Sequence, residues 1–316
     1  MYFPTTENMK TTLRFGHMQW IHYDSPTPDE IEKLVEQYEY HELIAEDLQE
    51  MTVQHKIDQY DDVIFVILNF PKYNVLNKRY MLNEFNIILG KDYIITLSRY
   101  EASHIAKIIA QYREDLAESD IQDEEAYKVS PYYILYTIID AMYDKTIKAQ
   151  SNASKDLVLL EWGMSDKDIK RETIEDLMRK KANAAFLKYT FLPQKEILVE
   201  MQKVCWWFYE WDLDVYFEDL ESKLDKIINT TLILYETIQS LTDTYDAMLN
   251  LQTNTIIRVL TVFTALTWIL TFISGFYGMN IQLPFMEHQF AWIFIVLSML
   301  TIVVVTLLYF KRKKRL

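Results

Sequence analysis

The chain has 316 residues and a formal net charge of −14. Because residues 254–316 carry six basic residues and a single acidic residue, the first 253 residues have a net charge of −19. So acidic a body repels nucleic acid, and no nucleic-acid partner is expected. The charge either concentrates cations or simply keeps the body soluble.

The first thirty residues lack the apolar run of a signal peptide. They are polar and interrupted by prolines, so no cleavable signal peptide is expected. Residues 11–23 follow a roughly alternating pattern of polar and apolar types, as expected of a strand. A helix is predicted to follow, with Thr27 as N-cap, Pro28 at its first position and acidic residues in its first turn. A short acidic helix is expected at residues 42–50.

The next segments predict a sheet. Residues 62–70 contain a continuous apolar run, Val63 to Leu68, rich in β-branched side chains, which indicates a buried strand. Residues 80–89 and 93–98 predict two more strands, with a turn at Gly90 between them. The pattern changes to that of a helix from His104. Residues 1–130 are therefore expected to form a cytoplasmic α/β domain with helices against a mixed sheet.

Residues 131–253 are predicted to be almost wholly helical. One helix is expected from Pro131 to Gly163, and another from Asp166 to Tyr209 with a kink at Pro193. After a turn near Asp212 there is neither proline nor glycine until Gly275, a helix of roughly 90 Å. Such a long helix predicts a stalk that packs against copies of itself or against the preceding helices.

Two apolar runs close the chain. Residues 259–276 are eighteen residues without a charge, and residues 290–310 are twenty-one. Each can cross a hydrocarbon core of about 30 Å as a helix. We therefore expect a transmembrane hairpin within residues 254–316, with spans at about 256–277 and 290–310 in the lipid bilayer, so the fold class is an α+β membrane protein.

The flanking charges predict the orientation. Residues 311–315 are all basic, whereas the link between the spans carries only Glu287 as a formal charge. The positive-inside rule places the C-terminus in the cytoplasm, and two crossings return the N-terminus to the same side. The expected location is the inner or plasma membrane, with residues 277–289 outside.

A motif follows the first span and carries a family resemblance. Tyr277-Gly278-Met279-Asn280 stands at the outer end of that span, and the chain here resembles the CorA family of divalent-cation channels. The resemblance extends upstream to residues 42–58 and 133–144. Counting back from Asn280 places Asp219 and Asp243 where related sequences carry aspartates. It covers nearly the whole chain and is weakest in the first twenty residues and in 145–195.

The resemblance implies a homopentameric funnel whose first span lines the pore. Candidate pore-lining residues follow at heptad-like spacing or form an apolar constriction: Asn254, Ile257, Leu260, Thr261, Thr264, Thr271 and Gly275. Hydroxyl and amide rings can touch hydrated ions, and an apolar constriction can gate a pore by dewetting. Alternatively the threonines serve helix packing. Trp268 shares the spacing but is too bulky to be included.

The resemblance also implies a selectivity filter at the motif. Mg²⁺ keeps several of its waters, so a ring of Asn280 carbonyls could hold the ion through its hydration shell. Gly278 would permit close backbone approach, and Met279 would pack the mouth. Glu287 is the candidate for gathering cations at the entrance. The simpler alternative is that Gly278 and Asn280 only cap a helix.

Regulation by intracellular Mg²⁺ is a further implication of the resemblance. The primary regulatory site would join Asp47 to Asp219 of the adjacent subunit, with Glu46 and Asp140 as second-site candidates. Loss of the ion would leave like charges facing each other and loosen the interface. The alternative is that these acids are simply solvated.

The sequence argues against an enzyme. The six histidines show no metal-ligand spacing, the single Cys205 cannot form a zinc site or an internal disulfide, and no phosphate-binding or nucleophile motif is present. The predicted function is passive uptake of hydrated Mg²⁺ through a channel. Two alternatives stay open: a zinc, cobalt or nickel transporter of the same fold, and a membrane-tethered oligomeric sensor or scaffold without transport.

Overall fold

A computed structural model describes residues 10–15, 17–100, 103–118, 128–163, 171–209, 212–279 and 290–312. The chain divides into two compact units, Met1–Leu241 and Thr242–Leu316. The first holds a sheet between two layers of helices, and the second holds two apolar helices. Each unit is described by itself.

The first unit is built on a six-stranded mixed sheet. Its strands are β1 (Lys10–Phe15), β2 (Met18–Asp24), β3 (Lys56–Gln59), β4 (Ile64–Asn74), β5 (Arg79–Leu89) and β6 (Tyr93–Ser98). Their spatial order is β1-β2-β6-β5-β4-β3. Within these described strands β2 and β6 pair in parallel and the other neighbours pair antiparallel. The mixed sheet expected from the sequence is therefore confirmed.

Two details of the predicted strands are wrong. The single strand predicted for residues 11–23 is instead two strands, β1 and β2, which pair antiparallel with Phe15 opposite Met18. The apolar positions change phase here, from Leu13 and Phe15 to Met18 and Trp20, and this three-residue step is the sequence signal of the reversal. The short strand β3 was not predicted, and β4 continues past Phe70 to Asn74, where it pairs with Arg79 of β5.

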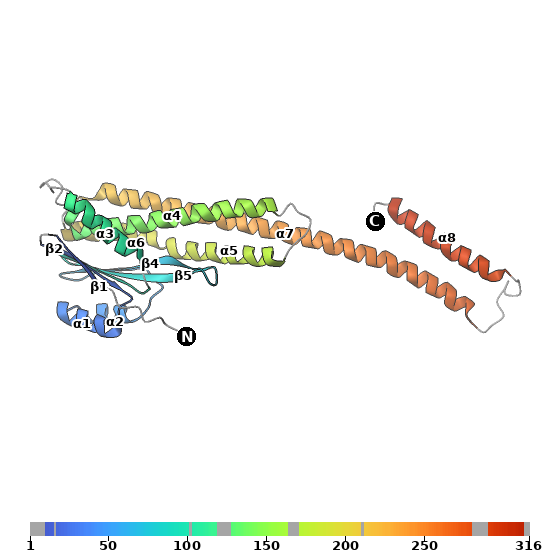
Figure 1. The fold of residues 1–316 in the computed structure, drawn as a ribbon, viewed down its shortest axis with the longest axis horizontal. Coiled ribbons are helices and arrows are strands. Elements are labelled where there is room, and N and C mark those ends of the chain that lie inside the picture. Colours follow the sequence, from blue (N-terminus) through green and yellow to red (C-terminus); the bar gives the residue numbers. More distant parts are fainter. Residues whose placement is uncertain are drawn as a thin grey trace. The chain divides into compact units, whose positions relative to one another are not determined.

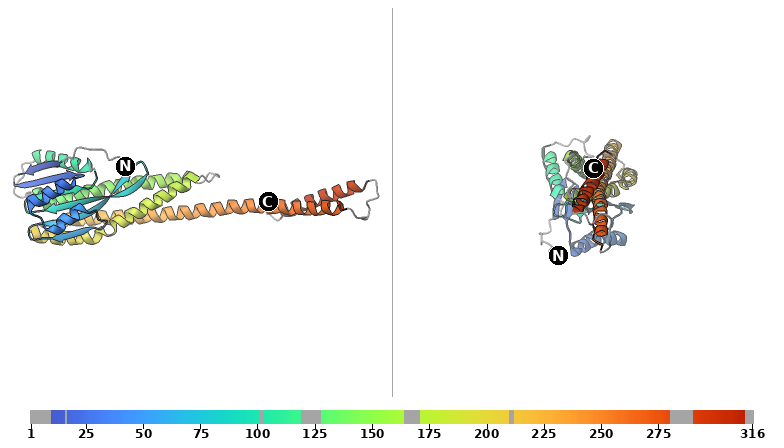
Figure 2. Two further views of the ribbon diagram at one scale, coloured as in Figure 1. Left: turned by 90° about the horizontal axis from the view of Figure 1, so that it is seen from below. Right: turned by 90° about the vertical axis from the view of Figure 1, so that its right-hand side faces the viewer.

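The sheet buries both faces. Alternate residues of β4 point to opposite sides, so Phe65 and Ile67 join one core while Val66 and Leu68 join the other. Helices α1 (Pro28–Tyr38) and α2 (Glu42–Gln49) cover the first of these faces (Figures 1 and 2). The predicted start of α1 is confirmed, because Thr27 and Glu30 form a reciprocal capping box.

Five helices belong to the layer over the other face (Figure 1). They are α3 (Ser103–Glu118), α4 (Pro131–Gly163), α5 (Arg171–Phe191), α6 (Gln194–Tyr209) and the first part of α7 (Asp214–Tyr277). The predicted bounds of α4 are confirmed. The single kinked helix predicted for residues 166–209 is wrong over its described part, since the chain breaks into α5 and α6 next to Pro193; residues 166–170 lie outside the described residues.

Buried hydrogen bonds explain why the break occurs there. Gln194, the first residue of α6, donates from Nε2 to the carbonyl oxygen of Asn69 on β4 at 2.8 Å. Its Oε1 accepts from the Tyr143 hydroxyl on α4 at 3.0 Å. Proline cannot continue the helix ladder, and the buried amide then joins the new helix to both the sheet and α4.

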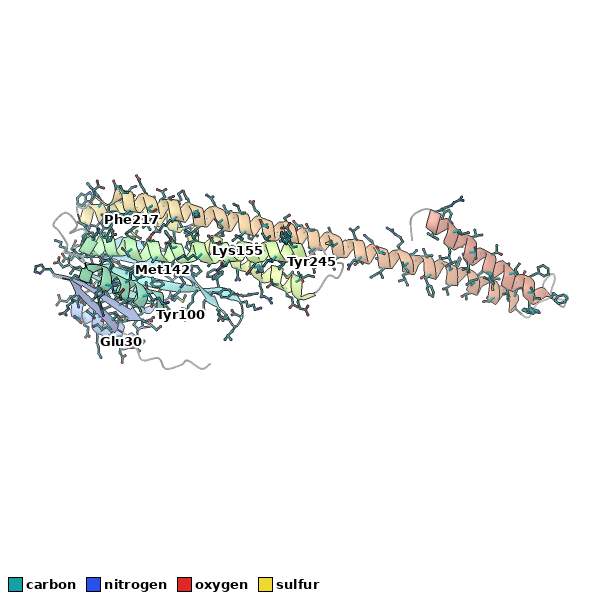
Figure 3. All side chains as sticks on the ribbon, turned by 45° about the horizontal axis from the view of Figure 1, so that its top comes forward. Glu30, Tyr100, Met142, Lys155, Phe217 and Tyr245 are labelled. Atoms are coloured by element: carbon teal, nitrogen blue, oxygen red, sulfur yellow. The ribbon has the colours of Figure 1, made fainter. Side chains whose placement is uncertain are left out.

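Helix α7 packs into the first unit through one buried stripe. The stripe recurs at alternating intervals of three and four residues and consists of Phe217, Leu220, Leu224, Ile227, Thr231, Leu234, Ile238 and Leu241. This is the heptad spacing of a helix–helix seam. Phe217, near the start of α7, and Met142 on α4 belong to the same core and are labelled in Figure 3. The stalk expected from the sequence thus packs on preceding helices of its own chain.

The second unit contains the apolar end of α7 and helix α8 (Ala291–Arg312), which among the described residues are the two helices that can span a membrane. Helix α7 ends at Tyr277. Both helices are long and apolar enough to cross a bilayer, by length and composition. Residues 242–277 continue α7 without a break in its helical hydrogen bonding.

A buried histidine in the sheet predicts sensitivity to acid. His22 is 2% exposed, and its Nδ1 lies 2.9 Å from the Thr96 hydroxyl. Burial lowers the pKa of His22 to about 4, although Asp24 and the Thr96 hydrogen bond act in the opposite direction. The unfolded chain therefore binds a proton that the folded chain does not between pH 6.5 and 4, so folding stability falls as pH falls through this window.

Between pH 6.5 and 4 the free energy of unfolding of the wild type should fall by about 3 kcal/mol through His22. We expect the His22→Gln variant not to show this fall. Thermal unfolding of the purified protein in detergent from pH 7 to pH 4 measures the difference. His17→Gln, which removes an exposed histidine in the neighbouring turn, is the matched control. Parallel pH profiles for the wild type and His22→Gln would contradict the prediction.

Candidate functional site

Three carboxylates surround one ammonium group on the helical layer. Nζ of Lys223 on α7 hydrogen-bonds Asp140 of α4, and it lies 3.2 Å from Asp144 of α4 and 3.6 Å from Asp219 of α7. The Lys223 and Asp140 side chains are about three-quarters buried, at 25% and 24% exposed. Two of the sequence-predicted regulatory residues, Asp140 and Asp219, are therefore brought together, with a cation between them.

The electrostatics of this cluster are unbalanced. Burial lowers the pKa of the Lys223 ammonium, but its hydrogen bonds to Asp140 and Asp144 raise it by more. The net effect is a raised pKa, so Lys223 stays charged. Burial and the charges of Asp144 and Asp219 raise the pKa of Asp140 against the opposing effect of Lys223. Burial, followed by the charges of Asp140 and Asp219, raises the pKa of nearby Tyr136 to about 12. One ammonium does not compensate three carboxylates, and the cluster keeps a negative potential.

A second, smaller cluster lies on the opposite face of the sheet. Asp47 of α2 contacts Nζ of Lys56 at 2.6 Å, and Asp58 contacts the same atom at 2.7 Å. Glu46, next to Asp47, is exposed. Because α2 and α7 cover different faces of the sheet, the single chain does not bring Asp47 to Asp219. A site that joins these two residues requires two subunits.

The carboxylates are of the type that binds magnesium, but in the single chain they are not placed to hold the ion. Mg²⁺ prefers carboxylate oxygens and water. Within the described part of the chain, however, there is no group of three or more histidine, cysteine, aspartate or glutamate side chains placed to hold a metal ion. Lys223 and Lys56 instead contact the acids directly. A divalent ion at either place has to displace the lysine or use oxygens from another subunit.

Four residues of these clusters were not predicted from the sequence: Lys223, Asp144, Lys56 and Asp58. A signal was available for two of them, because Asp144 follows Asp140 by four residues and Lys223 follows Asp219 by four residues, the spacing that brings side chains together on a helix. That α4 and α7 place both pairs against each other depends on the packing of the two helices.

The candidate pore-lining residues lie on the apolar part of α7. Asn254, Ile257, Leu260, Thr261, Thr264, Thr271 and Gly275 are all exposed in the single chain. The hydroxyls of Thr261 and Thr264 donate to the carbonyl oxygens of Ile257 and Leu260 at 2.7 and 2.8 Å, which satisfies them within the helix. Their oxygen atoms keep lone pairs that can accept from hydrated ions or neighbouring helices.

Helix α7 ends at the Gly-Met-Asn motif. The Gly278 N–H donates to the carbonyl oxygen of Ser274 at 2.9 Å, and a Cβ added at Gly278 would lie 3.1 Å from that oxygen. The close approach gives a steric reason for glycine at this position. Met279 is half exposed just beyond the helix end. Asn280 and Glu287 lie outside the described residues.

Comparison with known proteins identifies the class. A family model described as "CorA-like Mg2+ transporter protein" matches residues 15–312. The chain therefore belongs to the CorA family, whose members transport divalent cations across membranes and are not enzymes. The matched range includes strands β2 to β6, the helical layers and both apolar helices.

Individual relatives agree with this assignment. The chain is 24% identical over 289 residues to the cobalt/magnesium transport protein CorA of Thermotoga maritima, covering 90% of this chain and 80% of that protein. It is 23% identical over 296 residues to YfjQ of Bacillus subtilis, covering 93% and 88%. The complete structure of the CorA magnesium transporter from Methanocaldococcus jannaschii matches with a TM-score of 0.76 at 18% identity, covering 95% of this chain and 92% of that one, which shows the shared fold.

The Lys223 cluster yields a test of its charge balance. Lys223→Gln removes the cation and leaves three neighbouring carboxylates, so we expect a loss of about 1–2 kcal/mol of stability without divalent ions, a partly exposed site being worth less than a fully buried one. Mg²⁺ should then raise the melting temperature of the variant more than that of the wild type.

Thermal unfolding of the full chain in detergent, first in EDTA and then with Mg²⁺ added up to about 10 mM, measures this difference in melting temperature. Lys226→Gln makes the same charge change at an exposed position of α7 and is the control. An equal response to Mg²⁺ in all three proteins would show that Lys223 does not compete with the ion.

Proposed function

We propose that this protein is a magnesium channel through which hydrated Mg²⁺ enters the cell passively. The observation that carries the proposal is the family match over residues 15–312, which includes the acidic clusters as well as both apolar helices. The transported ion is the substrate of the protein. An inside-negative potential would drive a divalent ion inward with about 4.6 kcal/mol per 100 mV.

The channel is proposed to be a homopentamer in the cell or inner membrane. Two membrane helices per chain cannot enclose a water-filled path, so several copies around an axis are needed. The apolar part of α7 would line the pore and α8 would face lipid. The basic residues after α8 favour a cytoplasmic C-terminus, and two crossings place the N-terminal unit on the same side.

Selection is proposed to occur at Gly278, Met279 and Asn280. Five neutral amide oxygens of Asn280 could accept from the waters of a hydrated Mg²⁺ and so select by hydration geometry. The tight contact between Gly278 and the Ser274 carbonyl supports a helix end with closely approaching backbone. Glu287 is proposed to gather cations at the entrance.

Gating is proposed to depend on intracellular Mg²⁺ at the acidic clusters. Asp47 and Asp219 of the adjacent subunit would hold the primary ion, and Glu46 and Asp140 a second. A lysine accompanies the acids at each place: Lys223 contacts Asp140 and Asp219, and Lys56 contacts Asp47. Each lysine would supply positive charge in the absence of the ion and reduce the ion's affinity.

Cobalt is the second candidate ion. The Thermotoga maritima relative is named a cobalt/magnesium transport protein. The carboxylate oxygens of the acidic clusters and the amide oxygen of Asn280 can also accept Co²⁺ or its bound waters. A flux measurement with both ions therefore decides the order of preference.

The filter proposal is tested with Asn280→Ala in liposomes. An imposed inside-negative potential should drive fast Mg²⁺ uptake through the wild-type protein, which a trapped dye detects. We expect the substitution to reduce uptake by at least about tenfold, because each lost amide removes one acceptor of the ring.

Gln282→Ala removes an amide two residues further along and serves as the control. Both variants must elute as the wild-type oligomer before flux is compared. Equal flux through Asn280→Ala and the wild type would contradict the filter, and no flux through any folded protein would favour a tethered sensor or another metal.

The gating proposal is tested with Asp219→Lys. A fixed ammonium at this position should imitate the bound cation, so we expect flux to stay low whether internal Mg²⁺ is absent or high, whereas wild-type flux falls only as internal Mg²⁺ rises.

Glu218→Lys introduces the same charge at the adjacent exposed position and should retain the wild-type response. If flux through Asp219→Lys rises at high internal Mg²⁺, the regulatory role of Asp219 is wrong.

A further inference from the structure

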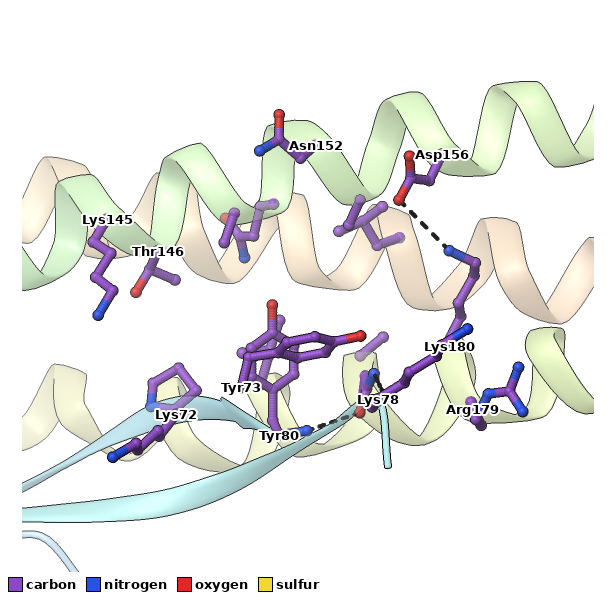
Figure 4. Close-up of a pocket in the computed structure, with 18 of the residues that line it drawn as sticks. Lys72, Tyr73, Lys78, Tyr80, Lys145, Thr146, Asn152, Asp156, Arg179 and Lys180 are labelled. Carbon is purple, nitrogen blue, oxygen red and sulfur yellow. Dashed lines mark hydrogen bonds and ion pairs between the residues drawn. The ribbon is translucent and has the colours of Figure 1, made fainter. Parts of the chain in front are cut away.

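Several cations of the first unit lie beside acids. A cavity of about 800 Å³ is lined by residues of α4, α5, α7 and the β4–β5 hairpin, and on its wall Nζ of Lys180 lies 3.9 Å from Asp156 (Figure 4). Lys223 and Lys56 likewise lie among the acids of the two clusters. These ammonium groups are compensated within the chain.

The second unit holds a cation in different surroundings, Arg258 of α7. This residue is exposed, and no other charged residue stands in α7 after Asp246. Asp246 precedes it by twelve residues, which is about 18 Å along a helix. Residues 291–316 contain no acidic residue. The two helices of this unit therefore offer Arg258 no carboxylate as a partner.

Arg258 and the basic end of α8 lie at the same depth of the proposed membrane hairpin. Tyr277, the last residue of α7, follows Arg258 by nineteen residues, and Arg312 follows Ala291, the first residue of α8, by twenty-one. These lengths are about 28 and 32 Å, close to the thickness of a hydrocarbon core. When both helices cross a bilayer, the two guanidinium groups therefore reach the same headgroup layer.

Arg258 also lies on the side of α7 that faces α8. Val262, one turn after Arg258, is 4% exposed, whereas its neighbours Thr261 and Phe263 are exposed. Residues four apart share a helix face. The other helix described in this unit is α8, and Figures 1 and 2 show that it runs back along the last part of α7, so it is the element that covers Val262. Thr261, a candidate pore-lining residue, lies on a different face from Arg258.

We propose that Arg258 and Arg312 bind the phosphate of an anionic phospholipid at the cytoplasmic end of the two apolar helices. A guanidinium group binds phosphate through two parallel N–H···O bonds, and basic residues next to a membrane helix attract anionic lipids. The basic run of residues 311–315 adds positive charge at the same end. The lipid would supply the counter-charge that the helices of this unit lack.

The proposed lipid site rests on the proposed insertion of α7 and α8 in the membrane, but not on the transported ion. Ile257, a candidate constriction residue, directly precedes Arg258. A lipid bound at Arg258 would therefore hold this part of α7 at the membrane surface. The competing account is that Arg258 lines the pore, where a ring of guanidinium groups would repel divalent cations.

The test is thermal unfolding of the purified full chain in nonionic detergent during titration with phosphatidylglycerol or phosphatidylcholine of the same acyl chains. We expect the wild type to bind the anionic lipid at least about thirtyfold more tightly. A basic residue at the membrane surface contributes about fivefold in affinity for anionic lipid. Arg258→Gln should therefore reduce the preference about fivefold, and Arg258→Gln with Arg312→Gln about twenty-five-fold.

Lys226→Gln is the matched control, because it makes the same charge change at an exposed position of α7, about 48 Å earlier along the helix. Each variant must elute as the wild-type oligomer and unfold at the wild-type temperature in phosphatidylcholine. Equal affinity of the wild type for the two lipids, or equal effects of Lys226→Gln and Arg258→Gln, overturns the proposal.

Two further measurements separate the lipid site from other accounts. Equal stabilisation by inorganic phosphate and by phosphatidylglycerol overturns the assignment to a lipid. A changed Mg²⁺ flux through Arg258→Gln with an unchanged lipid preference overturns the proposal in favour of a pore position. Selective lipid binding that Arg258→Gln weakens, in a protein without Mg²⁺ flux, confirms the lipid site and contradicts only the proposed channel.

Discussion

The fold of the helical layer depends on the buried stripe of α7. Apolar residues at intervals of three and four, from Phe217 to Leu241, seal this helix onto the helices before it. One polar pair interrupts the stripe: Gln150 of α4 donates to the Thr231 hydroxyl at 2.6 Å and to the Ile227 carbonyl oxygen at 2.9 Å. A shift of one helix along the other would leave this buried amide unpaired, so the pair specifies the register of α4 on α7.

That register has a functional consequence, because it sets the charges beside it. Asp140 and Asp144 come from α4, whereas Asp219 and Lys223 come from α7, and they meet only when these two helices are correctly aligned. The same helix α7 continues without interruption to Tyr277, next to Gly278. The gating proposal requires a change at the cluster to be transmitted through α7.

Acidic and basic side chains gather at different places in the first unit. Its surface is acidic, yet the two places where acids of proposed function gather each contain a lysine, and the cavity beside α4 and α5 is lined by an excess of cations. Fixed ammonium groups allow like charges to lie close together without a bound metal. If Mg²⁺ gates the protein as proposed, the ion has to compete with these lysines.

The sequence alone determined the elements whose signals are local. Thr27 and Pro28 specify the start of α1, the absence of proline and glycine specifies the length of α7, and two long uncharged runs specify the apolar helices. The Gly-Met-Asn motif in its context was enough for the family. Local signals were also incomplete: the three-residue step from Phe15 to Met18 was interpreted as part of one strand, and Pro193 ends a helix instead of bending it because Gln194 bonds to the sheet and to α4.

Only the tertiary structure decided which charges meet. Lys223 lies among acids from a helix about eighty residues earlier, and the cationic cavity combines the β4–β5 hairpin with α4 and α5. Such encounters depend on how helices pack across long sequence separations, where the free energy comes from the apolar seam and not from the charged residues themselves. The sequence shows that a lysine follows an aspartate by one helical turn; the packing of α4 on α7 determines that this lysine stands among three carboxylates.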